Sequence, residues 1–111
     1  FSLTAEGDIT IPGNFISGNT TLNVPDYVFE DGYALRPLSE VQTFIAANKH
    51  LPDVPSVADV ARDGLDLTQM QLAQLRKIEE LTLYTLEQET RLAAQAREIA
   101  DLRALVKTLL D

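Results

Sequence analysis

The chain has 111 residues, which is enough for one small domain with an appendage. It carries 9 Lys and Arg against 17 Asp and Glu, a net charge of −8. Nucleic acids and anionic membrane surfaces bind clustered basic side chains, so this charge balance argues against both as partners. The absence of cysteine excludes a disulfide, a thiolate zinc site and a cysteine nucleophile. No stretch approaches the roughly 18 apolar residues that would span a bilayer, so we expect no membrane insertion.

Residues 1–24 are rich in Gly, Asn, Thr and β-branched side chains. The alternation in residues 9–11 and 21–24 predicts short strands. Gly-Asp or Gly-Asn pairs, which favour tight turns, begin at Gly7, Gly13 and Gly18. The pattern predicts the end of a stacked β shaft, which needs partners because so short a segment cannot bury a core alone. The first residue is Phe1, so we expect a piece of a longer protein.

Residues 25–66 contain four of the five prolines and predict a small helical knob. Ser39 and Gln42 fit a capping box that opens one helix, which should end near Asn48 before Pro52.

A second short helix should begin after Ser56, with Asp59 three residues on, and end at Gly64. The expected core of the knob consists of Tyr27, Phe29, Tyr33, Leu35, Leu38, Val54 and Val57.

Residues 67–110 lack Gly and Pro and consist mainly of good helix formers. Thr68 and Gln71 offer a capping box at the start. Such a helix would be about 60 Å long at 1.5 Å per residue. Nothing else in this small chain is long enough to cover it, which predicts self-association.

A heptad pattern runs along this helix, and its a and d positions predict a coiled-coil seam. Seven of the ten positions are aliphatic, and the ten are Ile78, Leu81, Thr85, Gln88, Leu92, Gln95, Ile99, Leu102, Val106 and Leu109. The three polar positions lie together, where buried polar groups restrict register and oligomer state. A single long helix docked elsewhere on a parent protein is the alternative.

The stoichiometry of the coil rests on its polar layers. Three-fold packing would let Gln88 and Gln95 hydrogen-bond around the axis, with room for a water or an anion. Glu98 at g and Arg103 at e could pair between parallel chains, which would tune orientation more than strength. Aliphatic β-branched residues at three of the five a positions keep a dimer open as the alternative.

A second apolar stripe lies off the seam, in the first half of the helix. It consists of Leu72, Leu83 and Leu86, with Leu75 beside them. We therefore expect residues 70–86 to face the coiled-coil axis on one side and the knob on the other.

The residues typical of catalysis or metal binding have simpler interpretations here. His50, the only histidine, has no evident base or ligand beside it. The spacing of Asp53, Asp59, Asp63 and Asp66 does not follow a calcium-binding loop and suits helix caps and a solvated face. Ser39 and Glu40 could be a nucleophile and its base, but the G-x-S-x-G turn that presents such a serine is absent. We expect no enzyme activity, no metal and no cofactor.

Five motifs lie within residues 25–87: DYVFE at 26–30, NKHLP at 48–52, VPS at 54–56, GLDLTQM at 64–70 and KIEELTLY at 77–84. In combination they resemble the C-terminal segment of bacterial and phage tail-fibre-like proteins. The resemblance implies the end of a homotrimeric fibre, placed like the intramolecular chaperones of endosialidase-type tailspikes. Those chaperones carry a serine-dependent self-cleavage motif, SDxRLK. The nearest string, residues 32–36, lacks the serine, so self-cleavage is not expected.

The sequence thus predicts an α+β, elongated homotrimer. Residues 1–24 form a β shaft end, residues 25–66 an α-helical knob, and residues 67–111 a long helix in a parallel three-stranded coiled coil. The expected function is trimerisation and setting of the folding register at the end of an extracellular, cell-surface or virion fibre. The alternative is an adhesin tip that binds a host-surface glycan or protein, for which the candidate contacts are Tyr27, Tyr33, Arg36 and His50.

Overall fold

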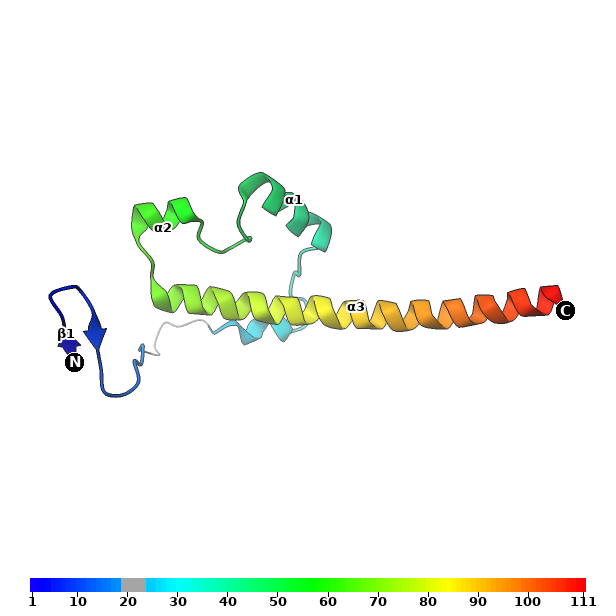
Figure 1. The fold of residues 1–111 in the computed structure, drawn as a ribbon, viewed down its shortest axis with the longest axis horizontal. Helices are drawn as coiled ribbons and strands as arrows, with labels where there is room; N and C mark the ends of the chain where they lie inside the picture. Colours follow the sequence, from blue (N-terminus) through cyan, green and yellow to red (C-terminus); the bar gives the residue numbers. More distant parts are fainter. Residues whose placement is uncertain (19–23) are drawn as a thin grey trace.

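A computed structural model describes residues 1–18 and 24–111. The elements in chain order are β1 (Ser2–Leu3), β2 (Ile9–Thr10), the 3-10 helix η1 (Pro25–Phe29), α1 (Leu38–Asn48), α2 (Val57–Asp63) and α3 (Leu67–Leu110). The molecule measures 82 × 33 × 29 Å, and α3 runs along most of its longest axis (Figure 1). The chain is therefore elongated and mostly helical, with one small antiparallel sheet.

The N-terminal segment folds as a short hairpin. Strand β1 pairs antiparallel with β2, and Leu3 lies opposite Ile9. Gly7, at φ 93°, allows the tight turn, which closes with a 2.8 Å hydrogen bond from the Thr4 N–H to the Asp8 carbonyl. The predicted strand at residues 9–11 and the turn at Gly7 are confirmed, whereas the strand expected at residues 21–24 lies largely outside the described residues.

Helix α1 begins one residue earlier than its expected capping box. Pro37 occupies the N-cap and makes no side-chain cap, while the Ser39 carbonyl accepts a 3.0 Å hydrogen bond from the Thr43 hydroxyl. The predicted Ser39 cap is wrong because the fixed φ of Pro37 already starts the helix. The expected end near Asn48 is confirmed, with Lys49 in the left-handed conformation.

Helix α2 has the predicted capping box. The Asp59 N–H donates to the Ser56 hydroxyl at 3.1 Å, and the Ser56 N–H donates to the Asp59 carboxylate at 2.9 Å. Gly64 ends the helix at φ 78°.

Helix α3 spans 44 residues, about 66 Å at 1.5 Å per residue. Its N-cap is Asp66, whose carboxylate accepts a 3.1 Å hydrogen bond from the Gln69 N–H. The predicted Thr68 cap is wrong because this carboxylate, two residues earlier, already satisfies a free N–H of the first turn.

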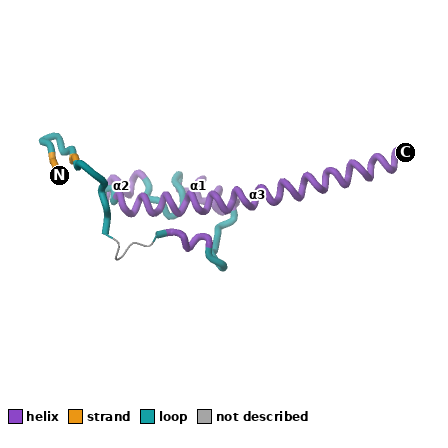
Figure 2. The backbone as a smooth tube through the Cα atoms, turned by 90° about the horizontal axis from the view of Figure 1, so that it is seen from below, coloured by secondary structure: helices purple, strands orange, loops and turns teal. Residues whose placement is uncertain are grey.

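The small core lies where η1 packs against α3. Val28 is 1% exposed and Pro25 is also buried. Figures 1 and 2 show η1 alongside the first half of α3, with the second half standing free. The expected core residues Phe29, Leu38 and Val57 are exposed, because among the described helices only η1 packs closely on α3.

Candidate functional site

The heptad seam of α3 lies on the surface along its whole length. Its seven aliphatic side chains are between 51% and 76% exposed: Ile78, Leu81, Leu92, Ile99, Leu102, Val106 and Leu109. So long a row of large apolar side chains on the surface indicates an interaction site.

Along residues 71–84 the knob covers most positions of α3 but leaves the seam open. Between residues 71 and 85 the exposed positions are Gln71, Gln74, Ile78, Leu81, Thr82 and Thr85. All but Thr82 are a or d positions, and Gln71 and Gln74 extend the register back by one heptad. The outward b, c, f and g positions of this stretch, which a simple coiled coil leaves in water, are buried or half-buried. The seam therefore stays open in the part of the helix where the chain could have covered it.

The second apolar stripe is covered only in part. Leu72, Leu75 and Leu83 are half-buried, as expected of residues that face the knob. Leu86 remains 58% exposed, so the prediction that the knob covers this residue is wrong. From Thr85 to the C-terminus every residue is exposed; the residues around the start of α1 reach the level of Gln88 and Arg91 but do not bury them.

A polar cluster, here called the Glu80 clamp, fastens the knob to α3. The Tyr33 hydroxyl donates to Glu80 Oε2 at 2.5 Å, and Lys77 Nζ donates to Glu80 Oε1 at 2.9 Å. Arg76 Nε donates to the Tyr33 hydroxyl at 3.2 Å, and its Nη2 lies 3.3 Å from Asp53 Oδ2. The clamp joins the loop after η1, the loop before α2, and one turn of α3.

The pKa directions within the clamp favour its closed form at neutral pH. Burial alone would raise the pKa of Glu80, but hydrogen bonds from Tyr33 and Lys77 and the nearby cations bring it below its ordinary value. Burial and the bond to the Glu80 carboxylate raise the pKa of the Tyr33 hydroxyl. Glu80 is therefore ionised and Tyr33 protonated at pH 7, as the hydrogen bond between them requires.

A hydrogen bond joins the residue before α1 to α3, and stacked side chains pack within the knob. The Tyr84 hydroxyl donates to the Arg36 carbonyl at 2.6 Å. The Arg36 guanidinium lies 5.9 Å from the centre of the Phe44 ring, and that ring meets His50 edge-on at 5.3 Å. His50 Nδ1 also lies 2.9 Å from the Leu51 carbonyl, so the single histidine is part of the knob's internal packing.

Glu79 is the least satisfied polar side chain at the η1–α3 interface. It is 6% exposed, and its Oε2 is buried with no hydrogen-bond partner among the described residues. Burial, followed by the neighbouring Asp26 carboxyl, raises the pKa of Glu79. Ionised Glu79 is thus a local cost in a helix turn whose next residue, Glu80, is well paired.

The four candidate receptor contacts fall into two groups. Tyr27 and Tyr33 lie together, with ring centres 6.0 Å apart, and Arg36 and His50 both contact Phe44. Three of the four have structural partners; Arg36 lines two hollows beside Tyr84, and Tyr27 lines a larger cleft.

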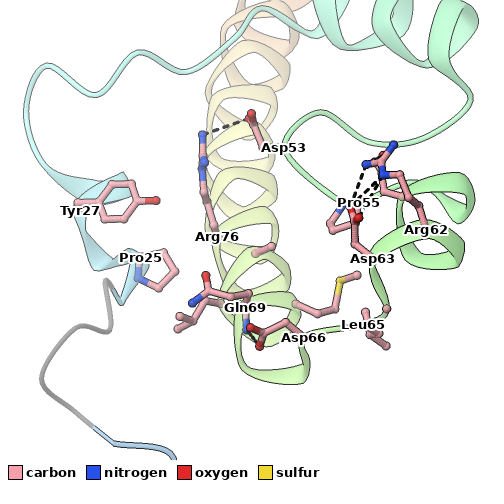
Figure 3. Close-up of a pocket in the computed structure, with 15 residues that line it drawn as sticks. Pro25, Tyr27, Asp53, Pro55, Arg62, Asp63, Leu65, Asp66, Gln69 and Arg76 are labelled. Atoms are coloured by element: carbon pink, nitrogen blue, oxygen red, sulfur yellow. Dashed lines mark hydrogen bonds and ion pairs between the residues drawn. The ribbon is translucent and has the colours of Figure 1, made fainter.

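That cleft, about 670 Å³ in volume, lies between η1, α2 and the first turns of α3 (Figure 3). Its charged side chains are largely paired with one another: Arg62 with Asp59 and Asp63, and Arg76 with Asp53. The Tyr27 hydroxyl and the Gln69 amide have no hydrogen-bond partner within the described part of the chain, so they are free for a ligand.

In residues 1–18 and 24–111, no three His, Asp or Glu side chains come together as a metal site would require. None of the helices described is both long and apolar enough to cross a membrane.

Comparison with known proteins adds no relative: no family model, no curated protein and no solved structure matches the chain significantly. The resemblance of residues 25–87 to tail-fibre-like proteins therefore stays a prediction based on its motifs.

Tyr33→Phe should destabilise the fold by about 2 kcal/mol, because it removes a hydrogen bond to a buried carboxylate. The measurement is urea unfolding followed by circular dichroism at one fixed chain concentration. Tyr27→Phe is the matched control and should cost less than about 0.5 kcal/mol, since the Tyr27 hydroxyl has no partner. Equal losses in the two variants would show that the clamp does not hold the knob.

Glu79→Gln should stabilise the fold at pH 7, because an uncharged amide relieves the repulsion with Asp26. The raised pKa of Glu79 means that the folded state binds this proton more tightly than the unfolded state. Its contribution to stability is present below the ordinary value of 4.5 and is lost as the pH rises through the folded-state pKa. The advantage of the variant should therefore shrink as the pH falls to 4.5 and below.

The measurement is the urea midpoint of both proteins from pH 4 to pH 8. Glu6→Gln, at an exposed position in the hairpin outside the knob, serves as the control and should give no comparable pH-dependent gain. A gain from Glu79→Gln that is the same at every pH would contradict the assignment.

Proposed function

We propose that this chain is a self-association device, a parallel homotrimer that closes the C-terminal end of a fibre protein. The observation that carries the proposal is the open seam: between residues 71 and 84 the knob covers most of the other positions of α3 and leaves the a and d positions exposed. Burying one Leu or Ile side chain contributes roughly 1.5–3 kcal/mol, so pairing this seam is strongly favourable. The partner that carries a matching heptad seam is a second copy of the chain.

Three chains fit the apolar surface better than two. Towards the C-terminus the stripe widens, since Leu105 at g and Leu110 at e are 55% and 81% exposed beside the seam. A helix that contacts two neighbours buries a wider stripe than one that contacts a single neighbour. Thr85 tolerates burial because its hydroxyl already donates to the Leu81 carbonyl at 2.8 Å.

A parallel, in-register arrangement uses the flanking positions well. Residues at g face residues at e of the next helix, five positions further along. This relation sets Glu98 against Arg103 and Leu105 against Leu110. The first pair is attractive, and the second extends the apolar core.

The role of the device in a fibre is to fix register. Repetitive strands such as those expected in a β shaft can slip against one another. A C-terminal coil holds three chains at one stagger and raises the local concentration of their shaft segments. The motif resemblance of residues 25–87 supports this placement on an extracellular, cell-surface or virion fibre. No catalysis is proposed.

Leu102→Asp should abolish association, because every chain then places a charge in the same layer of the apolar seam. Light scattering after size exclusion, across a concentration series, should give three chain masses for the parent protein and a lower mass for this variant. Ala104→Asp is the control, since the f position faces water in a trimer, and it should keep the trimer mass. A monomeric parent would refute the proposal, and a stable mass of two chains would replace the trimer with a dimer.

A second candidate function, adhesion, is favoured by one observation: within residues 1–18 and 24–111, the Tyr27 hydroxyl and the Gln69 amide in the cleft of Figure 3 have no hydrogen-bond partner. A concave site with an aromatic ring and free hydrogen-bonding groups suits a sugar. The cleft lies on faces of α3 other than the seam, so the two functions are compatible.

Tyr27→Ala should weaken glycan binding at least about tenfold, because the ring is the main apolar surface a sugar could stack on. The test applies the full chain to a glycan array and then titrates any hit. Phe29→Ala is the control, since Phe29 is an exposed aromatic of η1 that does not line the cleft. An array without hits, or hits unchanged by Tyr27→Ala, would refute adhesion through this cleft.

A further inference from the structure

Helix α1 has an apolar side that its own chain leaves open. None of its residues is buried, and Leu38 and Ile45 are exposed. Among the described helices only η1 packs closely on α3, so α1 stands away from it (Figure 1). A helix of 11 residues is too short to be stable without tertiary packing. Another surface must therefore complete the packing of α1.

The space between α1 and α3 is an apolar groove that joins the seam. It has a volume of about 280 Å³, and its apolar lining includes Leu38, Val41, Leu51, Ile78, Leu81 and Tyr84. Ile78 and Leu81 are the a and d residues of one heptad. Lys77 and Tyr84, which also line the groove, are g positions, so the groove opens on the g flank of the seam.

A second, independent observation lies on the other flank of α3. At 3.6 residues per turn, Thr82 and Leu86 lie four residues apart on the e side and form one exposed stripe. Leu86 is a large apolar residue outside the seam, yet it is 58% exposed and the knob of its own chain does not cover it. In a parallel coil the g flank of each helix faces the e flank of the next. The open groove and the uncovered stripe are thus brought face to face.

We infer that α1 of each copy docks on the e flank of α3 of the next copy, with Leu38 and Val41 against Leu86 and Thr82 of that copy. This inference rests on the proposed parallel trimer. The axial level agrees: Arg36 and Leu38 line a surface together with Tyr84 and Gln88 of their own α3. An in-register neighbour presents its Leu86 at that same level.

Charge complementarity supports a second copy as the occupant. Glu89, at e, makes no ion pair among the described residues. The g-to-e relation sets Tyr84 against Glu89 of the next copy. Tyr84 is hydrogen-bonded to the Arg36 carbonyl, and the Arg36 side chain, whose Nη2 lies 3.6 Å from Asp53 Oδ2, is still 42% exposed. The docked arrangement therefore brings the Arg36 guanidinium towards an unpaired carboxylate.

Each copy would then clasp the next around the three-fold axis. The knob's η1 covers the helix of its own chain, while α1 covers the helix of the neighbour. Such a ring of contacts makes the knob part of the trimer interface and explains why α1 and Leu86 are both open in a single chain.

The test uses cysteine cross-linking of the full chain, which contains no natural cysteine. Leu38→Cys and Leu86→Cys are combined in one chain and treated with a short bismaleimide. Docking to the next copy should link the chains head to tail, giving a covalent trimer as the main product on denaturing gels. Val57→Cys with Leu86→Cys is the control, since Val57 is 89% exposed on α2, and should give at least about tenfold less product.

Mixing the two single-cysteine variants, one of them carrying a mass tag, separates links between chains from links within a chain. A tagged–untagged product supports the inference, whereas a product of one chain mass from the double variant overturns it. Light scattering of the same samples keeps the two proposals distinct. A trimer mass without cross-linked chains refutes the clasp alone, and a monomer mass refutes both the clasp and the trimer.

Discussion

The length of α3 is the constraint on which the rest of the structure depends. A helix of 44 residues, about 66 Å long, has far more surface than a knob of some forty residues can cover. The knob reaches only its first five turns or so, and everything from Thr85 onwards is exposed. The apolar residues of the uncovered half are regularly spaced, so together with the polar positions Gln88 and Gln95 they form a heptad seam. A helix of this kind is completed by other helices, which makes assembly the natural function to propose.

The knob itself is held more by polar contacts than by a core. Among the described residues, Val28 and Pro25 are the fully buried side chains, whereas the Glu80 clamp ties two loops to one turn of α3. Glu79 and Glu80 are adjacent and nearly equally buried, but their surroundings shift their pKa values in opposite directions. Cations and a hydroxyl surround Glu80, while a second carboxyl faces Glu79. The attachment of the knob to α3 is therefore favourable at Glu80 and unfavourable at the neighbouring Glu79.

The sequence predicted those elements that depend on neighbouring residues alone. The long helix, the seam and the Ser56 capping box were all readable from composition, period and spacing. Helix starts at Ser39 and Thr68 were misplaced because a nearby Pro37 or Asp66 competes for the same role. Helix η1 is a single 3-10 segment without a periodic apolar pattern. No pattern in the sequence therefore predicted that η1 supplies the buried residues of the core.

The residue pairs of the Glu80 clamp could not be predicted, because their members are far apart in the sequence. Tyr33 and Glu80 are 47 residues apart, and nothing in the sequence marks them as partners. The open seam at Gln71 and Gln74 could have been found by extending the heptads backwards. The exposure of Leu86 could not have been found in this way, because it depends on how far the knob extends along α3.

The distribution of apolar layers along the seam gives the proposed assembly a direction. The last four layers, at Ile99, Leu102, Val106 and Leu109, are all aliphatic, whereas Thr85, Gln88 and Gln95 interrupt the middle. Association should therefore start at the C-terminal end, where each layer gains the most and no other part of the chain needs to move. The polar layers then reward only the correct register, since a shifted pairing leaves buried amides without partners. By the time the pairing reaches the knob and the hairpin beyond it, the stagger of the three chains is already set.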